Sequence, residues 1–504
     1  MNIIPLFIAI PLGFAFLIPM FSRKVRWLPD MLGNLATLSL VILSFYTIGR
    51  TGNYYMGGWR PPIGINLVLD GFSSLMLIMV SGVSFAATLF SVQYMEKYTS
   101  KLRYYSLFLL MVAGMNGVAL TGDMFNLYVF LEIASIASYA LVGFGCDHEE
   151  LEASFKYLVL GSIASTFILF GIALIYGMTG SLNMAHVGQM IQQQGMGPTL
   201  LFAMVMFLMG FGLKAALVPF HAWLPDAHPS APAPISAMLS GVLIKVLGVY
   251  AMMRIFFNVI GVDEKLSWVF IGAGVISMVV GGLLALGQWD YKRLLAYSSI
   301  SQMGYVILAI GVGGMAMARG GAGANSVAAL ALLGGLFHLI NHATFKSLMF
   351  LTSGSVVYGT NTRDLKKMGG LFYKMPITGL CAMVGSLSIA GLPPFNGFWS
   401  KLIIILACVK AGFYGIALVA VAVSVITLAY YLKLQKYAFF GEVGEGLKDV
   451  KESPSLMCLS MGILAVLCVG LSLLLLPGPR AVLLDPAVEA VLQGTDYITV
   501  VLGR

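Results

Sequence analysis

The sequence predicts an all-α polytopic membrane protein that crosses the bilayer about fourteen times. Its residues are 59% hydrophobic and only 10% charged, whereas a soluble globular chain carries about 25% charged residues. The mean hydropathy is +0.91, and at 504 residues the chain is too long for one or two spans. Apolar runs of about 20 residues, enough to cross a bilayer as a helix, recur along the whole chain.

Each predicted span is an apolar run that a short polar loop separates from the next. Several runs exceed 25 residues, so we expect those helices to tilt or to break inside the membrane. The fourteen runs centre near residues 12, 39, 80, 112, 133, 165, 210, 244, 276, 302, 342, 388, 424 and 466. No stretch between them exceeds about 30 residues, which leaves no room for a separate catalytic or sensory domain.

The loops on one side of the predicted bundle carry more basic residues than the loops on the other side. The first side has fifteen: Arg23, Lys24, Arg26, Lys97, Lys101, Arg103, Lys292, Arg293, Arg363, Lys366, Lys367, Lys374, Lys436, Lys448 and Lys451. The second side, with both termini, has eight: Arg50, Arg60, Arg254, Lys265, Arg319, Lys410, Arg480 and Arg504. Because cytoplasmic loops are enriched in Lys and Arg, the first side is predicted to face the cytoplasm and both termini to face outward.

The composition argues against several classes of function. The formal net charge of +8 reflects membrane orientation rather than nucleic acid binding, because the basic residues cluster in loops between apolar runs. The five cysteines form no CxxC pair and no ligand spacing, so we expect no disulfide framework, zinc site or iron–sulfur cluster. No GxGxxG or Walker motif follows a strand. The chain is therefore predicted to hold no cofactor, no metal and no redox centre of its own.

Two of the predicted helices contain prolines that should interrupt them. The run around Lys214 continues into residues 218–234, which hold five prolines. The run near residue 388 contains GLPPFNG at 391–397, and Lys401 follows it. Proline removes a backbone donor, and carbonyls freed inside a bilayer must meet protein or water. Two broken helices in comparable places, each beside a lysine, are the pattern of a repeated transporter fold.

Glu132 lies near the middle of the apolar run 125–144, and Lys214 and Lys245 lie inside other apolar runs. A charge at membrane depth costs roughly 2.5–3.5 kcal/mol on insertion scales, so such residues are usually functional. A carboxylate beside a lysine keeps both charged, and a lysine that loses its partner releases its proton more readily. We predict that Glu132 and Lys214 form a switchable proton site and that Lys245 receives the proton. The alternative is a static ion pair that holds three helices together.

A second group of ionisable residues lies in the run GLFHLINHATFKSLMFL. His338, His342 and Lys346 are spaced by four and therefore share one face of a helix. Histidine holds and releases protons near neutral pH, so we predict a proton relay. Metal binding and plain packing are the alternatives, although no third metal ligand is evident. Lys401 would sit at depth after the second helix break, where it is predicted to be a terminal proton site.

The proline-rich segment adds three more polar residues, His221, Asp226 and His228. They are predicted either to line a water path or to hydrogen-bond the backbone groups that the break frees. Lys156, near a helix end, is predicted either to line the same water path or to snorkel to the interface. Asp123 is predicted to have a structural role at a helix end.

Five segments together resemble a known family. They are LTGDMFNLYVFLEIASIASYALV (120–142), LKAALVPFHAWLPDAHPSAPAPISAMLSGVLIKVLGVY (213–250), QWDYKRLLAYSSISQMGY (288–305), LFHLINHATFKSLMFLTSGSV (336–356) and AGLPPFNGFWSK (390–401). Across roughly residues 65–440 the chain resembles the antiporter-like, proton-translocating subunits shared by respiratory complex I, Mrp-type Na⁺/H⁺ antiporters and membrane-bound hydrogenases. It is most similar to the medium-length Mrp and hydrogenase-type members.

The resemblance implies fourteen helices with two inverted five-helix repeats, each containing a broken helix. Residues 1–100 would hold helices 1–3, residues 101–260 the first repeat (helices 4–8), residues 261–440 the second repeat (helices 9–13), and residues 441–504 helix 14 and a tail. Glu132, Lys214 and Lys245 match the ion-translocating residues of the family's fifth, seventh and eighth helices. His338, His342 and Lys401 match polar residues of its eleventh and twelfth helices.

The resemblance also implies a function. We expect a subunit that moves protons, or Na⁺, in a redox-driven complex such as a complex I-like dehydrogenase or a membrane-bound hydrogenase, where it would be a non-redox subunit of an oxidoreductase. Two alternatives stay open: a subunit of an Mrp-type Na⁺/H⁺ antiporter without redox chemistry, and a scaffold that conducts nothing. Expected partners are further antiporter-like subunits, small membrane subunits and, in the redox case, a peripheral arm with iron–sulfur clusters. The expected location is the prokaryotic cell (inner) membrane.

Overall fold

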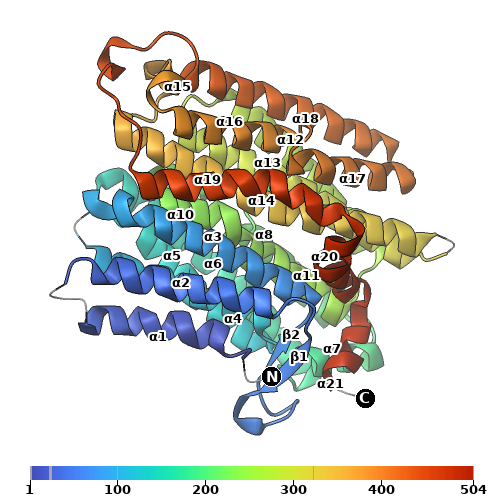
Figure 1. Cartoon of the computed structure of the whole chain (residues 1–504). Coiled ribbons are helices and arrows are strands. Elements are labelled where there is room, and N and C mark those ends of the chain that lie inside the picture. The colour runs from blue at the N-terminus through green and yellow to red at the C-terminus, as the bar shows by residue number, and fades with distance from the viewer. Residues whose placement is uncertain (1–2, 22–24, 99, 322, 503–504) are drawn as a thin grey trace.

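A computed structural model describes residues 3–21, 25–98, 100–321 and 323–502 of the protein. They form a bundle of long helices that run roughly parallel to one another (Figure 1). The helices of the first part of the chain are α1 (Leu6–Phe21), α2 (Leu28–Tyr46), α3 (Gly71–Tyr94), α4 (Lys101–Leu120), α5 (Met124–Val142), α6 (His148–Thr179), α7 (Met184–Gln194), α8 (Pro198–Lys214) and α9 (Leu224–Ser230).

The next helix, Ala233–Ile260, contains α10 (Ala233–Met238) and α11 (Ala251–Met253) joined by π-helical turns at Leu239–Leu243, Lys245–Tyr250 and Arg254–Ile260. The helices that follow are α12 (Glu264–Gly287), α13 (Tyr291–Arg319), α14 (Ala324–Thr360), α15 (Leu371–Lys374), α16 (Pro376–Ala390), α17 (Asn396–Lys410), α18 (Tyr414–Leu434), α19 (Ser455–Gly470), α20 (Pro477–Leu492) and α21 (Tyr497–Leu502).

The expected all-α polytopic membrane fold is confirmed. Among the described residues, eleven helices are long and apolar enough to cross a membrane. Three shorter apolar helices, Leu6–Phe21, Pro198–Lys214 and Pro376–Ala390, coincide with the predicted spans centred near residues 12, 210 and 388. Two features were not predicted. Strands β1 (Gly52–Tyr55) and β2 (Asn66–Leu69) pair antiparallel, and the tail beyond α19 contains the helices α20 and α21.

Aspartates define where several helices begin. The side chains of four of them accept a hydrogen bond from a backbone N–H three residues later, as N-cap residues do. They are Asp70 before α3, Asp123 before α5, Asp263 before α12 and Asp290 before α13. The predicted structural role of Asp123 is thus confirmed, and burial raises the pKa of its carboxyl.

Small residues allow the central helices to approach closely. A Cβ added to Gly274 of α12 would lie 2.5 Å from the backbone nitrogen of Leu308, and one added to Gly304 of α13 would lie 2.5 Å from that of Met278. In a bilayer, where lipid is as apolar as leucine, such close backbone packing is a principal source of helix association. Large apolar side chains such as Phe155, Leu418 and Val466 point outward instead.

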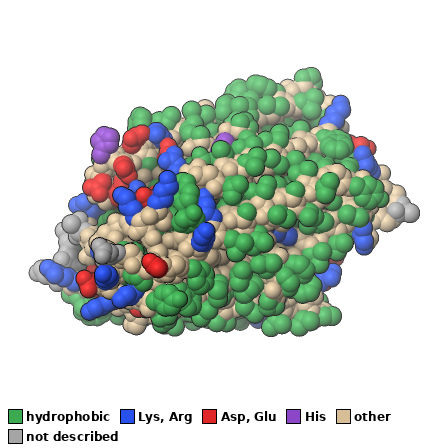
Figure 2. Space-filling view, turned by 90° about the horizontal axis from the view of Figure 1, so that it is seen from above, with side chains coloured by type: hydrophobic (Ala, Val, Ile, Leu, Met, Phe, Trp, Pro, Cys, Tyr) green, Lys and Arg blue, Asp and Glu red, His purple; other side chains and the backbone are tan. Residues whose placement is uncertain are grey.

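Charged side chains gather toward the two ends of the bundle, with a mainly hydrophobic surface between them on the face that Figure 2 shows. The start of α1, the hairpin β1–β2, α7 and α21 lie at the same end (Figure 1). There the side chain of Asn53 in β1 contacts the backbone carbonyl of Val501 in α21 at 3.5 Å. At the opposite end, the loops near residues 98, 147, 230, 290 and 363 surround one pocket.

Two basic residues that the sequence analysis assigned to loops are in fact buried, and that assignment is wrong. Arg254 lies inside the helix Ala233–Ile260 and is paired with Asp70. Lys292 lies in the first turn of α13, where its amine donates to the Ala231 carbonyl at 2.6 Å. Both side chains bind residues of other elements. Counting the basic residues of each loop does not detect such contacts. Arg23, Lys24 and Arg504 lie outside the described residues.

Candidate ion-translocation site

The first helix break lies directly after Lys214. Helix α8 ends there, Ala216 has a positive φ of 55°, and the chain resumes as α9 at Leu224. Two side chains satisfy backbone groups that the break frees. The indole N–H of Trp223 donates to the Leu213 carbonyl at 3.0 Å, and the backbone N–H of Val218 donates to the Ser277 hydroxyl at 3.0 Å. These backbone groups at the break are therefore hydrogen-bonded by protein side chains, as they must be inside a membrane.

Lys214 and Glu132 form the ion pair that the sequence predicted. The Lys214 amine lies 3.9 Å from a Glu132 carboxylate oxygen, and the two side chains are 4% and 24% exposed. The amine also donates to the hydroxyl of Ser135 at 2.8 Å and to that of Tyr139 at 3.2 Å. Ser165 on α6 donates to the same Glu132 oxygen. The Glu132 oxygen is thus shared between a lysine and a serine.

Ser135 and Tyr139 are functional candidates that the sequence analysis missed. They follow Glu132 by three and seven residues on α5, so the three side chains share a helix face. The sequence could have indicated them, because this spacing places their hydroxyls on the same face of α5 as the Glu132 carboxylate and therefore near the partner of that carboxylate.

Lys245 is fully buried in a π-helical part of the helix Ala233–Ile260. Its amine donates to the Ser240 carbonyl, five residues earlier, at 2.5 Å. Gly248, one turn later, packs against the first helix break, since a Cβ there would lie 2.5 Å from the backbone nitrogen of Ala215. The absence of a side chain at Gly248 brings the helix that carries Lys245 against the residue that follows Lys214.

Helix α14 carries His338, His342 and Lys346, and all three are fully buried. The Lys346 amine donates to the Leu295 carbonyl at 2.9 Å and to the Tyr431 hydroxyl at 3.2 Å. His338 Nδ1 lies 2.9 Å from the hydroxyl of Ser400 on α17.

The two histidine rings of α14 lie near each other, with ring centroids 6.4 Å apart. Within the part of the chain that the structure describes, neither ring nitrogen of His342 has a hydrogen-bond partner, nor has Nε2 of His338. A neutral imidazole has one unprotonated nitrogen, so His342 can accept a proton there without first breaking a bond to protein, as can Nε2 of His338 in the tautomer whose Nδ1 carries the hydrogen.

The second helix break separates α16 from α17. Gly391 ends α16 with a positive φ of 82°, and a Cβ there would lie 3.1 Å from Cδ of Lys401. Lys401 sits on α17 after the break, as predicted, and is 2% exposed. Its amine donates back across the break to the Ile389 carbonyl at 2.7 Å and lies 5.0 Å from the ring centroid of Tyr305.

The buried lysines differ in how their charge is balanced. Lys214 has Glu132, whereas Lys245, Lys346 and Lys401 donate to backbone carbonyls. Among the described residues no carboxylate forms an ion pair with any of these last three. An ammonium without a carboxylate partner is costly to bury, so each of these three depends on the carbonyl that it donates to. They also interact electrostatically with the histidines of α14.

The four residues predicted for a water path do not form one cluster. His228 is fully buried, stacks on Phe350 at 4.3 Å between ring centroids, and has no hydrogen-bond partner on its ring among the described residues. His221 is half-buried beside Tyr297. Asp226 accepts from Lys156 at 3.2 Å and from Arg293 at 2.7 Å. Asp226 and Lys156 thus belong to an ion-pair network at one end of the bundle.

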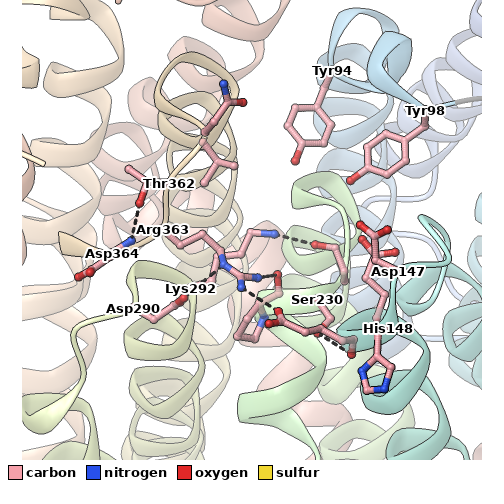
Figure 3. Close-up of a pocket in the computed structure, with 16 residues that line it drawn as sticks. Tyr94, Tyr98, Asp147, His148, Ser230, Asp290, Lys292, Thr362, Arg363 and Asp364 are labelled. Carbon is pink, nitrogen blue, oxygen red and sulfur yellow. Dashed lines mark hydrogen bonds and ion pairs between the residues drawn. The ribbon is translucent and has the colours of Figure 1, made fainter. Parts of the chain in front are cut away.

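A pocket of about 700 Å³ opens at that end, and Figure 3 shows residues of several elements around it. Its wall includes Tyr98, whose burial raises the pKa of its hydroxyl and keeps it neutral. Lys292 points into the pocket region and is held by the Ala231 carbonyl, while Arg363 pairs with Asp290 at 3.3 Å (Figure 3). His228 interacts electrostatically with Lys292, Lys346 and Lys245.

No metal-binding arrangement is formed by the described residues, because no group of three His, Cys, Asp or Glu side chains is close enough to hold an ion. His338 and His342, the pair for which metal binding was an alternative, have no third ligand of these types beside them.

Comparisons with known proteins agree with one another. A family model described as "NADH:quinone oxidoreductase/Mrp antiporter, TM" matches residues 121–427, and one described as "NADH-Ubiquinone oxidoreductase (complex I), chain 5 N-terminus" matches residues 60–105. A subunit of the NADH-quinone oxidoreductase of Desulforudis audaxviator is 35% identical over 446 residues, which cover 87% of this chain and 85% of that protein.

Two further similarities come from an antiporter and from a solved structure. A subunit of the Na⁺/H⁺ antiporter of Alkalihalophilus pseudofirmus is 35% identical over 448 residues, or 88% of this chain and 87% of that protein. A chain of an archaeal membrane-bound sulfane sulfur reductase, described as a respiratory membrane complex, is 33% identical with a TM-score of 0.87 and covers 100% of both chains. On these matches the chain belongs to the NADH:quinone oxidoreductase/Mrp antiporter family of antiporter-like membrane subunits.

Proposed function

We propose that this chain translocates protons, with Na⁺ as the second candidate ion, as one subunit of a multi-subunit membrane complex. The observation that carries the proposal is a series of ionisable side chains inside the bundle: the partly buried Glu132 and the buried Lys214, Lys245, His338, His342, Lys346 and Lys401. If these residues only filled the core, apolar side chains would occupy the same volume without the desolvation cost of an ammonium group that has no carboxylate partner. A chain of proton sites requires such groups.

The two helix breaks support the finer architecture of the proposal, namely fourteen spans with inverted repeats at residues 101–260 and 261–440. Each break has a buried lysine beside it, Lys214 before the first and Lys401 after the second. In transporters, broken helices at corresponding places in two halves mark the ion pathway. Residues 1–100 would then hold the N-terminal helices, and residues 441–504 the last span and its tail.

A charge change at the Glu132 end would start the movement. While Glu132 faces Lys214, the ammonium is stabilised. When a neighbouring subunit draws the carboxylate away, Lys214 keeps only its two hydroxyl partners, and its proton moves on toward Lys245. The proton then passes through the histidines and lysines of α14 to Lys401. This chain contributes proton binding and release, and it needs no cofactor for either.

The main alternative within this function concerns what drives ion movement: the chain belongs either to a redox-driven complex or to a Na⁺/H⁺ antiporter. A relative from an NADH-quinone oxidoreductase and one from a Na⁺/H⁺ antiporter are each 35% identical to the chain, so identity favours neither. We favour a redox-driven complex with iron–sulfur subunits in a peripheral arm, because the chain of the archaeal respiratory complex is 33% identical, whereas a chain of an Mrp complex with nearly equal coverage is 29% identical. We place it in the prokaryotic inner membrane with both termini outside. Purifying the tagged complex and identifying its other chains would decide: iron–sulfur or nickel–iron proteins support the redox complex, and only small membrane subunits support the antiporter.

Lys214→Met in the intact complex tests translocation itself. Reconstituted into vesicles with a pH-sensitive dye, the variant should lose at least about 100-fold in coupled ion flux, the range that a positioned proton-transfer group contributes. Lys265→Met is the matched control, because Lys265 is exposed at the start of α12 and should leave flux unchanged. Normal flux through assembled Lys214→Met complex would instead support a non-conducting scaffold.

A further inference from the structure

Lys245 and Lys346 are joined through two serines, by hydrogen bonds at each end and by the covalent frame of Ser240 between its carbonyl and its hydroxyl. The Lys245 amine donates to the carbonyl of Ser240, and the hydroxyl of Ser240 lies 2.7 Å from the hydroxyl of Ser299 on α13. Ser299 in turn donates to the Leu295 carbonyl at 2.9 Å. The Lys346 amine donates to that same carbonyl at 2.9 Å.

The direction of the hydroxyl bonds follows from these contacts. A serine hydroxyl has one proton to donate. Since the proton of Ser299 goes to Leu295, Ser240 must be the donor in the bond between the two serines. Both hydroxyl dipoles therefore point from the Lys245 side toward the carbonyl that Lys346 uses. Ser240 and Ser299 are fully buried, so these dipoles act in a medium of low dielectric.

The two serines do not form a proton wire, because both lysines are bound to backbone carbonyls, which cannot pass a proton on. We propose that Ser240 and Ser299 are positioning residues whose hydroxyl pair couples the charge states of Lys245 and Lys346. This inference rests on the proposed function, since the coupling has a purpose only if both lysines take up and release ions.

The coupling works through the Leu295 carbonyl, whose oxygen accepts from Ser299 and from Lys346 at the same time, each at 2.9 Å. A charged Lys346 is the stronger donor, so it weakens the bond of Ser299 to the shared oxygen and favours the reversed orientation in which Ser299 donates to Ser240. With Lys346 neutral, Ser299 returns to Leu295 and accepts from Ser240. The pair thus has two orientations, and each fits a different location of the charge.

Other ionisable groups also act on these lysines and would remain in any serine variant. Within electrostatic reach of one or both lysines are His228, His338, His342 and Lys401. Removing the serine hydroxyls should therefore slow the transfer of charge between Lys245 and Lys346 without abolishing it.

The test uses the intact complex in vesicles and compares Ser240→Ala, Ser299→Ala and the double variant. Each alanine keeps the backbone carbonyls that hold the lysines. We expect each single variant to lower coupled flux about fivefold, the value of one hydrogen bond, and the double variant to lose no more than either single one. Ser299→Thr, which keeps a hydroxyl at this position, should retain wild-type flux. Ser301→Ala is the control, because this buried serine of the same helix donates to the Met278 carbonyl at 2.9 Å, away from both lysines.

Three results would overturn the inference. They are wild-type flux in both alanine variants, losses that multiply in the double variant, or an equal loss in assembled Ser301→Ala complex. Flux is compared per assembled complex, so a variant that folds poorly is not mistaken for an uncoupled one. Lys214→Met in the same vesicles separates the two proposals: if it loses flux while the serine variants do not, only the coupling inference fails, and if it keeps flux, translocation by this chain fails.

Discussion

The amine of Lys401 on α17 donates to the carbonyl of Ile389 on α16, at 2.7 Å, and so joins the two halves of a broken helix. The lysine thereby has two roles. It satisfies a carbonyl that has lost its helical partner, and it places an ionisable group at membrane depth. Charge on Lys401 and the geometry of the break are linked by this one contact.

Lys401→Met should remove both roles. We expect coupled ion flux to fall about 100-fold, as for loss of a positioned proton-transfer group, and the Ile389 carbonyl to lose its partner. Flux in reconstituted vesicles measures the first effect. Lys410→Met is the matched control, since Lys410 is exposed at the far end of the same helix. Unchanged flux in the Lys401 variant would remove this residue from the pathway.

Glu132→Gln tests the carboxylate beside Lys214. Glutamine preserves an acceptor for the Ser165 hydroxyl but removes the charge that lies 3.9 Å from the lysine amine. Because an unpaired buried charge is strongly disfavoured, Lys214 should lose its proton too early, and flux should fall about tenfold or more. The exposed Glu264, substituted in the same way, provides the comparison. Equal flux in the two variants would contradict the switch.

Trp223→Phe tests how the first break is held together. The substitution removes the indole N–H that donates to the Leu213 carbonyl but keeps an aromatic ring for stacking on Tyr157, 4.2 Å away between centroids. A buried carbonyl without a donor costs about 1–3 kcal/mol, so the thermal unfolding midpoint of the complex should fall. Trp268→Phe, at a partly exposed indole on α12, should not lower it. A midpoint that is equally unchanged in both variants would show that the break is held by other contacts.

The buried pair of Arg254 and Asp70 lies at the end of the bundle where α20 and α21 pack. Removing one partner of such a pair costs about 3–5 kcal/mol, so Arg254→Met should destabilise the protein strongly. Adding Asp70→Asn should recover part of the loss, because asparagine is neutral and still caps α3. Unfolding midpoints of the three variants measure this, and a double variant less stable than Arg254→Met would refute it.

Much of the fold could be predicted because its causes are local. Apolar runs identify spans, and the prolines of residues 218–234 and 391–397 remove backbone donors wherever the chain goes, so both helix breaks were predictable. The hairpin of β1 and β2 was not, since its strands are short and lie between apolar runs. Arg254 and Lys292 were assigned to loops because nothing near them in the sequence indicates their distant partners, Asp70 and Ala231.

The candidate site, too, has features that follow from the local sequence and features that depend on distant partners. The sequence alone predicted that Glu132, Lys214, Lys245 and Lys401 lie inside apolar spans, because each of them is flanked by apolar residues along the chain. Only the tertiary structure decided which of them has a carboxylate, and which serines and carbonyls hold the others. Hydrogen-bond partners such as Leu295 for Lys346 lie 51 residues away. Short-range directional contacts of that kind depend on how helices pack, and helix packing is a property of the whole folded chain.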